Sequence, residues 1–109
     1  MRKTYIGELE EVVLLTVAIL QEEAYGVAIT QHIEHQLNRK LSISAVHATL
    51  HRLSEKGYVN SQMGGATAKR GGRRKRYFKV TTAGSWVLNE IQDARNLLWA
   101  QIPPNILTI

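Results

Sequence analysis

Apolar residues recur at intervals of three and four along four stretches of the chain, and this spacing predicts four helices. We expect them at residues 7–20, at 27 to about 38, between Ser42 and Gly57, and at 82 to about 101. The first is apolar nearly all round, which indicates a helix buried on more than one side. In so short a chain, this pattern suggests contact with a second subunit as well as with the chain's own core.

The second and third predicted helices each have one apolar face. The inward residues are Val27, Ile29 or Thr30, Ile33 and Leu37 on the second helix, and Val46, Leu50 and Leu53 on the third. The opposite face of the third helix carries Ser44, His47, Ala48, His51 and Glu55, with Arg52 at its edge. Hydroxyl and imidazole groups can hydrogen-bond to base edges or phosphates, and a small alanine permits close approach to a groove.

The ends of the predicted helices carry recognisable signals. Ser42 stands where an N-cap is wanted, and its oxygen can accept the first free backbone N–H groups. Gly57 follows Lys56 and is a typical stop signal. Residues 81–84 cap the last helix. The first helix begins with Glu8, Glu10 and Glu11, which oppose the helix dipole favourably.

Two short extended runs, residues 58–63 and 73–80, flank a tip that contains four glycines. Two helices joined by a short turn and followed by such a hairpin form the winged variant of the helix-turn-helix. We therefore predict a mainly α fold with a two-stranded β-wing. Residues 1–81 would form a winged helix-turn-helix DNA-binding domain, and residues 82–109 a C-terminal dimerisation helix and tail.

The last predicted helix is apolar along its length and precedes the Pro103–Pro104 pair. Val87, Ile91, Ala94 and Leu98 follow a 4-3-4 spacing that resembles a coiled-coil seam, and Trp86, Leu88, Leu97 and Trp99 widen it. Since the first three helices already supply a core, this helix is expected to pair with its copy. The residues expected at that interface are Leu9, Val13, Val87, Ile91, Ala94 and Leu98.

Positive charge is concentrated in one part of the chain. Residues 56–89 contain eight Lys and Arg and no Asp or Glu, whereas the net charge of the whole chain is +5. A concentrated basic stretch indicates a polyanionic partner. A solvated basic loop is the alternative, but Tyr77, Phe78 and Val80 follow the charges directly and favour an anchored strand.

Size and composition limit the remaining possibilities. A chain of 109 residues fits one small domain, and with no cysteine it has no disulfide framework and no thiolate chemistry. No segment approaches the roughly 18 apolar residues of a membrane span. Arg2 and Lys3 are followed at once by glutamates, which is atypical of a signal peptide. We expect a soluble cytoplasmic protein.

Four blocks of sequence resemble one known family. GELEEVVLLTVAIL, AYGVAI, LSISAVHATLHRLSEKGYV and RGGRRKRYFKVTTAG arrive in this order between residues 6 and 88. They are similar to the PadR-type transcriptional regulators of bacteria, in the small subfamily with a short C-terminal region. The resemblance implies a winged-helix homodimer that binds a two-fold operator, usually as a repressor, with the last helix dimerising with help from the first.

The predicted contacts to double-stranded DNA fall into two groups. Phosphate contacts by the wing would provide most of the affinity, and the helix would position the protein and read the sequence. The helix candidates are Ser42, Ser44, His47, Ala48, His51 and Arg52. The wing candidates are Lys69, Arg70, Arg73, Arg74, Lys75 and Arg76.

The chain departs from the family pattern at His47, where relatives usually have tyrosine. Histidine offers a shorter, titratable donor or acceptor, so the contact that relatives make here does not transfer directly. The resemblance also implies a flat aromatic effector held between interface tryptophans. Trp99 lies on the appropriate helix for that role and Trp86 is the second candidate, while an ordinary interface tryptophan is the alternative.

Other classes of function have weaker support. His32 and His35, like His47 and His51, are spaced to share a helix face, but a metal site needs a third ligand and a second shell, so no metal and no cofactor are expected. No hydrolase or nucleotide-binding motif occurs, which argues against an enzyme. An RNA- or ribosome-binding basic module is the main alternative, and an anionic membrane surface is a weaker one.

Overall fold

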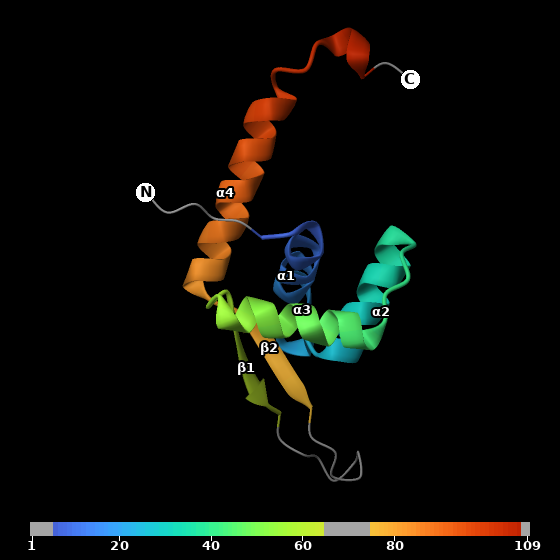
Figure 1. The fold of residues 1–109 in the computed structure, drawn as a ribbon, viewed down its shortest axis with the longest axis vertical. Coiled ribbons are helices and arrows are strands. Elements are labelled where there is room, and N and C mark those ends of the chain that lie inside the picture. The colour runs from blue at the N-terminus through green and yellow to red at the C-terminus, as the bar shows by residue number, and fades with distance from the viewer. Residues whose placement is uncertain (1–5, 65–74, 108–109) are drawn as a thin grey trace.

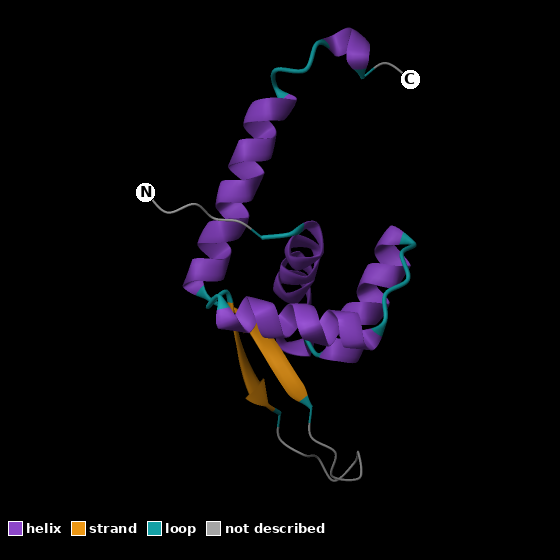
Figure 2. Cartoon of the chain, in the orientation of Figure 1, coloured by secondary structure: helices purple, strands orange, loops and turns teal. Residues whose placement is uncertain are grey.

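The computed structural model describes residues 6–64 and 75–107 of the chain. In order, the elements are α1 (Glu8–Leu20), the 3-10 helix η1 (Gln21–Glu23), α2 (Gly26–Leu37), α3 (Ile43–Glu55), β1 (Val59–Met63), β2 (Arg76–Val80), α4 (Thr82–Trp99) and the 3-10 helix η3 (Pro104–Ile106) (Figure 1). The chain is mainly helical and has one two-stranded antiparallel sheet (Figure 2), which confirms the predicted winged-helix fold class.

The described elements form a helical body with two projections. Helices α1, α2 and α3 gather in the body, the two strands extend from one side of it, and α4 projects away on the opposite side (Figure 1). Helix α1 is central, because it contacts α2, α3, β2 and α4. The buried apolar residues at the centre are Val13, Leu14, Val17, Ala24, Ile29, Ile33, Val46, Leu50, Leu53, Val59 and Phe78.

The predicted inward face of α3 is confirmed, and that of α2 is confirmed only in part. Ile29 and Ile33 are buried, but Val27 and Leu37 are 51% and 53% exposed, so these two predictions were wrong. Val27 precedes Ile29 by two residues and therefore lies about 200° away around the helix. Leu37 is the last residue of α2 and extends beyond the core.

Two residues expected at a dimer interface belong instead to the core of the single chain. The side chains of Val13 and Val87 are 0% and 1% exposed, so they leave no surface for a partner. Val13 lies on the side of α1 that faces the other helices, and Val87 lies where the start of α4 meets the body. The apolar spacing correctly indicated a buried face, but the elements that cover this face belong to the same chain and not to a second subunit.

The predicted helix ends are confirmed. Ser42 Oγ accepts a hydrogen bond from the Ala45 N–H at 3.0 Å, as expected of an N-cap. Gly57 has φ +83°, a conformation that suits glycine. Thr81 caps α4 by accepting from the Gly84 N–H at 3.0 Å, and its hydroxyl donates to the Gly57 carbonyl at 2.7 Å. The start of α4 is therefore tied to the turn that ends α3.

The wing is anchored to the body, as the apolar residues after the basic stretch predicted. In the sheet, Val59 pairs with Val80 and Met63 with Arg76. Strand β2 also bonds to the segment before α2, where the Phe78 N–H donates to the Ala24 carbonyl at 2.9 Å. The Phe78 side chain is only 6% exposed. Both edges of β2 are thus held near the body.

Helix α4 begins against the body and ends away from it. Gly84 and Val87 are buried, whereas every residue from Gln92 to the end of the helix is exposed. Among the described residues, no helix is both long enough and apolar enough to span a bilayer.

The contact at Gly84 generates a prediction about stability. A Cβ atom at this position would overlap the carbonyl oxygen of Tyr58 and come within 2.9 Å of Val80 Cγ1. Gly84→Ala should therefore lower the free energy of unfolding by about 1–3 kcal/mol, although alanine is the better helix former. Urea unfolding at fixed protein concentration measures this change in the free energy of unfolding. Ser85→Ala, at the next and exposed position, is the control and should change little. Equal stability of Gly84→Ala and the parent chain would contradict the packing described here.

Candidate nucleic-acid interface

Helix α3 presents the predicted polar face to solvent. Val46, Thr49, Leu50 and Leu53 turn inward and are 0–1% exposed. This orientation leaves the opposite face free, and all six helix candidates for DNA contact are exposed: Ser42, Ser44, His47, Ala48, His51 and Arg52. Thr49 was not singled out in the sequence. Its hydroxyl donates to the Ala45 carbonyl at 2.8 Å, which satisfies it inside the core.

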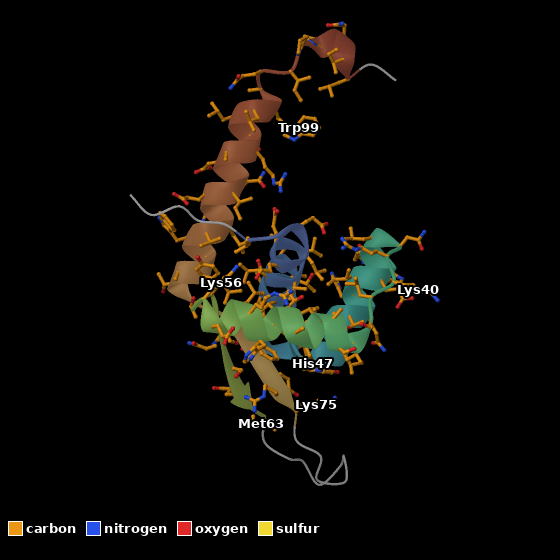
Figure 3. All side chains as sticks on the ribbon, in the orientation of Figure 1. Lys40, His47, Lys56, Met63, Lys75 and Trp99 are labelled. Carbon is orange, nitrogen blue, oxygen red and sulfur yellow. The ribbon has the colours of Figure 1, made fainter. Side chains whose placement is uncertain are left out.

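His47 lies against the beginning of α2. A Cβ atom on Gly26 would come within 2.7 Å of the His47 ring, so glycine at this position lets the imidazole lie over the backbone. Figure 3 shows His47 on the side of α3 from which the strands extend. The contact places the His47 ring of α3 close to the backbone at the start of α2.

Arg52 differs from the other helix candidates because the fold already uses its side chain. Its Nε atom lies 3.6 Å from a carboxylate oxygen of Glu10 on α1, and its guanidinium donates to Thr49 Oγ1 at 3.2 Å. The side chain is still 51% exposed. Arg52 thus fixes α3 to α1, in addition to the recognition role expected for it.

Glu10 is a nearly buried carboxylate that sequence reasoning assigned only to the helix dipole. Its side chain is 8% exposed; it accepts from the Gly7 N–H at 2.7 Å and from Lys56 Nζ at 3.1 Å on both oxygens. Burial tends to raise the pKa of Glu10, but the Gly7 N–H, Lys56 and Arg52 outweigh it and hold the pKa below its ordinary value of 4.5. A glutamate three residues after the N-cap was the readable signal for the bond to Gly7.

The two neighbouring glutamates of α1 make corresponding links to other elements. Glu8 pairs with Arg39, in the turn between α2 and α3, at 2.8 Å, and this hydrogen bond lowers the pKa of Glu8 and raises that of Arg39. Glu11 pairs with Arg95 of α4 at 2.7 Å, which raises the pKa of Arg95. The first turn of α1 therefore binds cations from three different parts of the chain.

The base of the wing is organised by aromatic contacts. The rings of Tyr25 and Tyr77 meet edge to face with centroids 5.5 Å apart, and Lys75 Nζ lies 4.0 Å from the centre of the Tyr25 ring. This cation–π contact holds Lys75 close to the body (Figure 3). Arg76 donates to Ser61 Oγ at 3.0 Å across the strands. The wing candidates Lys69, Arg70, Arg73 and Arg74 lie outside the described residues.

The remaining interface candidates lie on α1 and α4. Leu9 and Ile91 are half-buried, and Ala94 and Leu98 are exposed. Trp86 and Trp99 are 53% and 60% exposed. Figure 3 shows Trp99 at the far end of α4, projecting toward the side on which α1 lies.

The histidine pairs do not gather a set of metal ligands within the described parts of the chain. Over residues 6–64 and 75–107, no group of three His, Cys, Asp or Glu side chains is arranged to hold a metal ion. Instead, His51 Nε2 lies 3.4 Å from a carboxylate oxygen of Glu55 on the same helix.

Comparison with known proteins gives consistent matches. The model of the transcriptional regulator PadR-like family matches residues 14–90, more than half of the chain. The fold is similar to a PadR-like transcription factor from Bacteroides fragilis, with a TM-score of 0.69 and 23% identity, covering 83% of this chain and 82% of that one. It is also similar to Bacillus subtilis PadR in complex with operator DNA, with a TM-score of 0.62 and 18% identity, covering 77% of this chain and 46% of that one. In sequence, the chain is 29% identical over 98 residues to an uncharacterised protein of Lysinibacillus sphaericus, covering 88% of this chain and 82% of that protein.

The environment of Glu10 predicts a pH-dependent contribution to stability. Because folding lowers its pKa, the ionised carboxylate stabilises the fold above the unfolded value, and this contribution is lost as the pH falls through the lower folded value. Glu10→Gln should therefore cost about 1–3 kcal/mol at neutral pH, and the difference from the parent chain should shrink below pH 4.5. Urea unfolding over a pH series at constant protein concentration measures this.

Glu8→Gln is the matched control for that experiment. It is the same substitution in the same helical turn, but Glu8 and Arg39 are both open to solvent, so the loss should be smaller. If the stability lost in Glu10→Gln were the same in acid as at neutral pH, the interaction removed would not depend on the charge of the carboxylate.

Proposed function

The chain belongs to the PadR-like family of transcriptional regulators, and from this premise we propose that it binds a two-fold operator in double-stranded DNA as a homodimer and represses transcription. The observation that carries the proposal is the exposed polar face of α3 beside the anchored base of a basic wing. We assign DNA recognition to residues 1–81 and dimerisation to residues 82–109. As a DNA-binding regulator, the protein would act in the bacterial cytoplasm, at the nucleoid.

The side chains on α3 suit direct reading of DNA. Ser44, His47 and His51 bring hydroxyl and imidazole groups to one exposed face, and Ala48 lies among them. A helix of this kind enters the major groove, where donors and acceptors distinguish the base pairs. Since Arg52 is partly engaged by Glu10, we give Arg52 a positioning role and assign the contacts with base edges or phosphates to the other residues.

The wing would supply most of the electrostatic attraction. Lys69, Arg70, Arg73 and Arg74 extend the basic stretch beyond Lys75 and Arg76. Each lysine or arginine that neutralises a phosphate releases counterions, which makes the affinity strongly dependent on salt. The fold of this chain is similar to that of Bacillus subtilis PadR, whose crystal structure is a complex with operator DNA.

Dimerisation is supported by apolar surface that the single chain leaves open. Leu97, Leu98 and Trp99 at the end of α4 are 60–65% exposed, and Ile106 in the tail is 64% exposed. Large apolar side chains left this exposed on a small protein indicate a binding partner. A second copy is the partner we propose, with Leu9, Ile91, Ala94 and Leu98 at the interface. An aromatic effector between Trp99 and its copy, with Trp86 as a second contact, is the accompanying proposal for regulation.

The RNA-binding alternative is less well supported. Readers of single strands present aromatic rings on an open surface on which bases stack. Phe78 is 6% exposed, and Tyr77 packs against Tyr25, so neither ring of the wing forms such a platform. Competition between duplex DNA and structured RNA for the purified protein would distinguish the two functions.

The wing assignment predicts a change in salt dependence. Arg73→Ala with Arg74→Ala should reduce the slope of log affinity against log salt by about one unit for each phosphate that the variant no longer neutralises. Fluorescence anisotropy on one labelled duplex over a range of salt concentrations measures the slope. Lys79→Ala removes one charge from β2 and is the control, with a slope close to that of the parent chain. An unchanged slope in the double variant would show that Arg73 and Arg74 of the wing do not neutralise phosphates.

The dimer assignment predicts the effect of charge on α4. Leu98 is 64% exposed, so Leu98→Asp should leave the folded monomer intact but dissociate the dimer at micromolar concentration. Without two-site binding, the affinity for the operator should then weaken about tenfold or more. Asn96→Asp adds the same charge on another face of α4 and is the control. Sedimentation velocity measures both variants, and a monomeric parent chain, or a dimer indifferent to Leu98→Asp, would refute the interface.

A further inference from the structure

A cleft of about 380 Å³ lies between the exposed face of α3 and the sheet of the wing. Its lining joins three elements: His47, His51 and Ser54 come from α3, Ser61 from β1, and Arg76 and Phe78 from β2. Phe78 forms an apolar floor, because its ring belongs to the core. The rest of the lining consists of imidazole, guanidinium and hydroxyl groups. We call this site the histidine cleft.

The charged and polar groups around the histidine cleft favour an anion. Arg76 carries a permanent positive charge and is oriented by its bond to Ser61 Oγ at 3.0 Å. The N-terminus of α2, which carries partial positive charge, lies against His47 at Gly26. One carboxylate opposes an anion here. Glu55 lies 3.4 Å from His51 Nε2 and would compete with a bound anion for the His51 ring.

We propose that the histidine cleft seats one backbone phosphate of the bound duplex, and that protonation of His47 and His51 ties the affinity for DNA to pH. This inference rests on the proposed function, since it presupposes that α3 and the wing contact the same DNA. The position of the cleft fits such a phosphate, because the recognition helix and the wing form its two walls.

The chemistry of the lining also distinguishes a phosphate from other occupants. A phosphodiester accepts hydrogen bonds on unprotonated oxygens, and charge-assisted donors such as imidazolium and guanidinium bind it most strongly. A metal ion would be repelled by Arg76. A base edge would use one imidazole nitrogen in either protonation state, whereas a phosphate gains a full charge interaction only when the ring is protonated.

The pH dependence follows from linkage. A neutral imidazole must take up a proton before it can bind a phosphate as a cation. Binding to the histidine cleft therefore takes up protons, and the affinity rises as the pH falls. We expect about tenfold tighter binding at about pH 5.5 than at about pH 7.5 at constant ionic strength, together with a salt slope steeper by about one unit at the lower pH, because one phosphate is seated.

The test compares the parent chain with the double variant His47→Gln and His51→Gln. The parent chain should show the rise in affinity, and proton uptake measured by calorimetry in buffers of different ionisation enthalpy. In the double variant, affinity should be nearly independent of pH. The matched control is His35→Gln, an exposed histidine at the end of α2, which should behave as the parent chain does. His51→Gln alone is the second variant, because the His51 side chain is 73% exposed and its replacement leaves the core unchanged.

The possible results separate a failure of this inference from a failure of the proposed function. Tight but pH-independent binding by the parent chain, or equal pH dependence in the double variant, overturns the inference and leaves the proposed function standing. Absence of duplex binding at every pH overturns the proposed function itself, and this inference with it. Millimolar inorganic phosphate at matched ionic strength should not displace the duplex; displacement would identify a site for free phosphate and overturn the assignment to the DNA backbone.

Discussion

The arrangement of this fold depends on the acidic first turn of α1. Glu8, Glu10 and Glu11 are close in sequence, yet their partners come from the turn before α3, from the end of α3, and from α4. Glu10 contributes most, because its carboxylate is nearly buried and is satisfied by one backbone N–H and two cationic side chains. Buried charges persist only when they are paired and hydrogen-bonded, so the positions of these partners are linked to the position of α1.

This arrangement connects the two ends of the molecule. The apolar side of α1 fills the core against α2 and α3, and its acidic turn holds both α3 and α4, the helix that projects away from the body. The histidine face of α3 and the base of the wing converge because Phe78 and Val59 anchor the sheet to the same core. The positions of α3, β2 and α4 thus all depend on contacts with α1.

Much of the candidate site could be predicted from the sequence, since it depends on local features. The exposed face of α3 follows from the inward spacing of Val46, Leu50 and Leu53, and the wing follows from glycines and charges between two β-forming runs. The double use of Arg52 and the approach of His47 to Gly26 could not be predicted. Both depend on how helices cross, and periodicity within one helix carries no information about its neighbours.

By itself, the sequence determined the four helices, the caps at Ser42 and Thr81, the turn at Gly57, the order of elements and the resemblance to a family. These are encoded by short-range spacing and by the conformational preferences of single residues. Only the tertiary structure decided which apolar surfaces are internal, as at Val13 and Val87, and which remain open, as at Val27 and Leu37. It also decided the pairing of Glu10 with Lys56, 46 residues away. The physical reason is that burial and ion pairing depend on which distant segment arrives at a surface, and this is set by the packing of the whole chain.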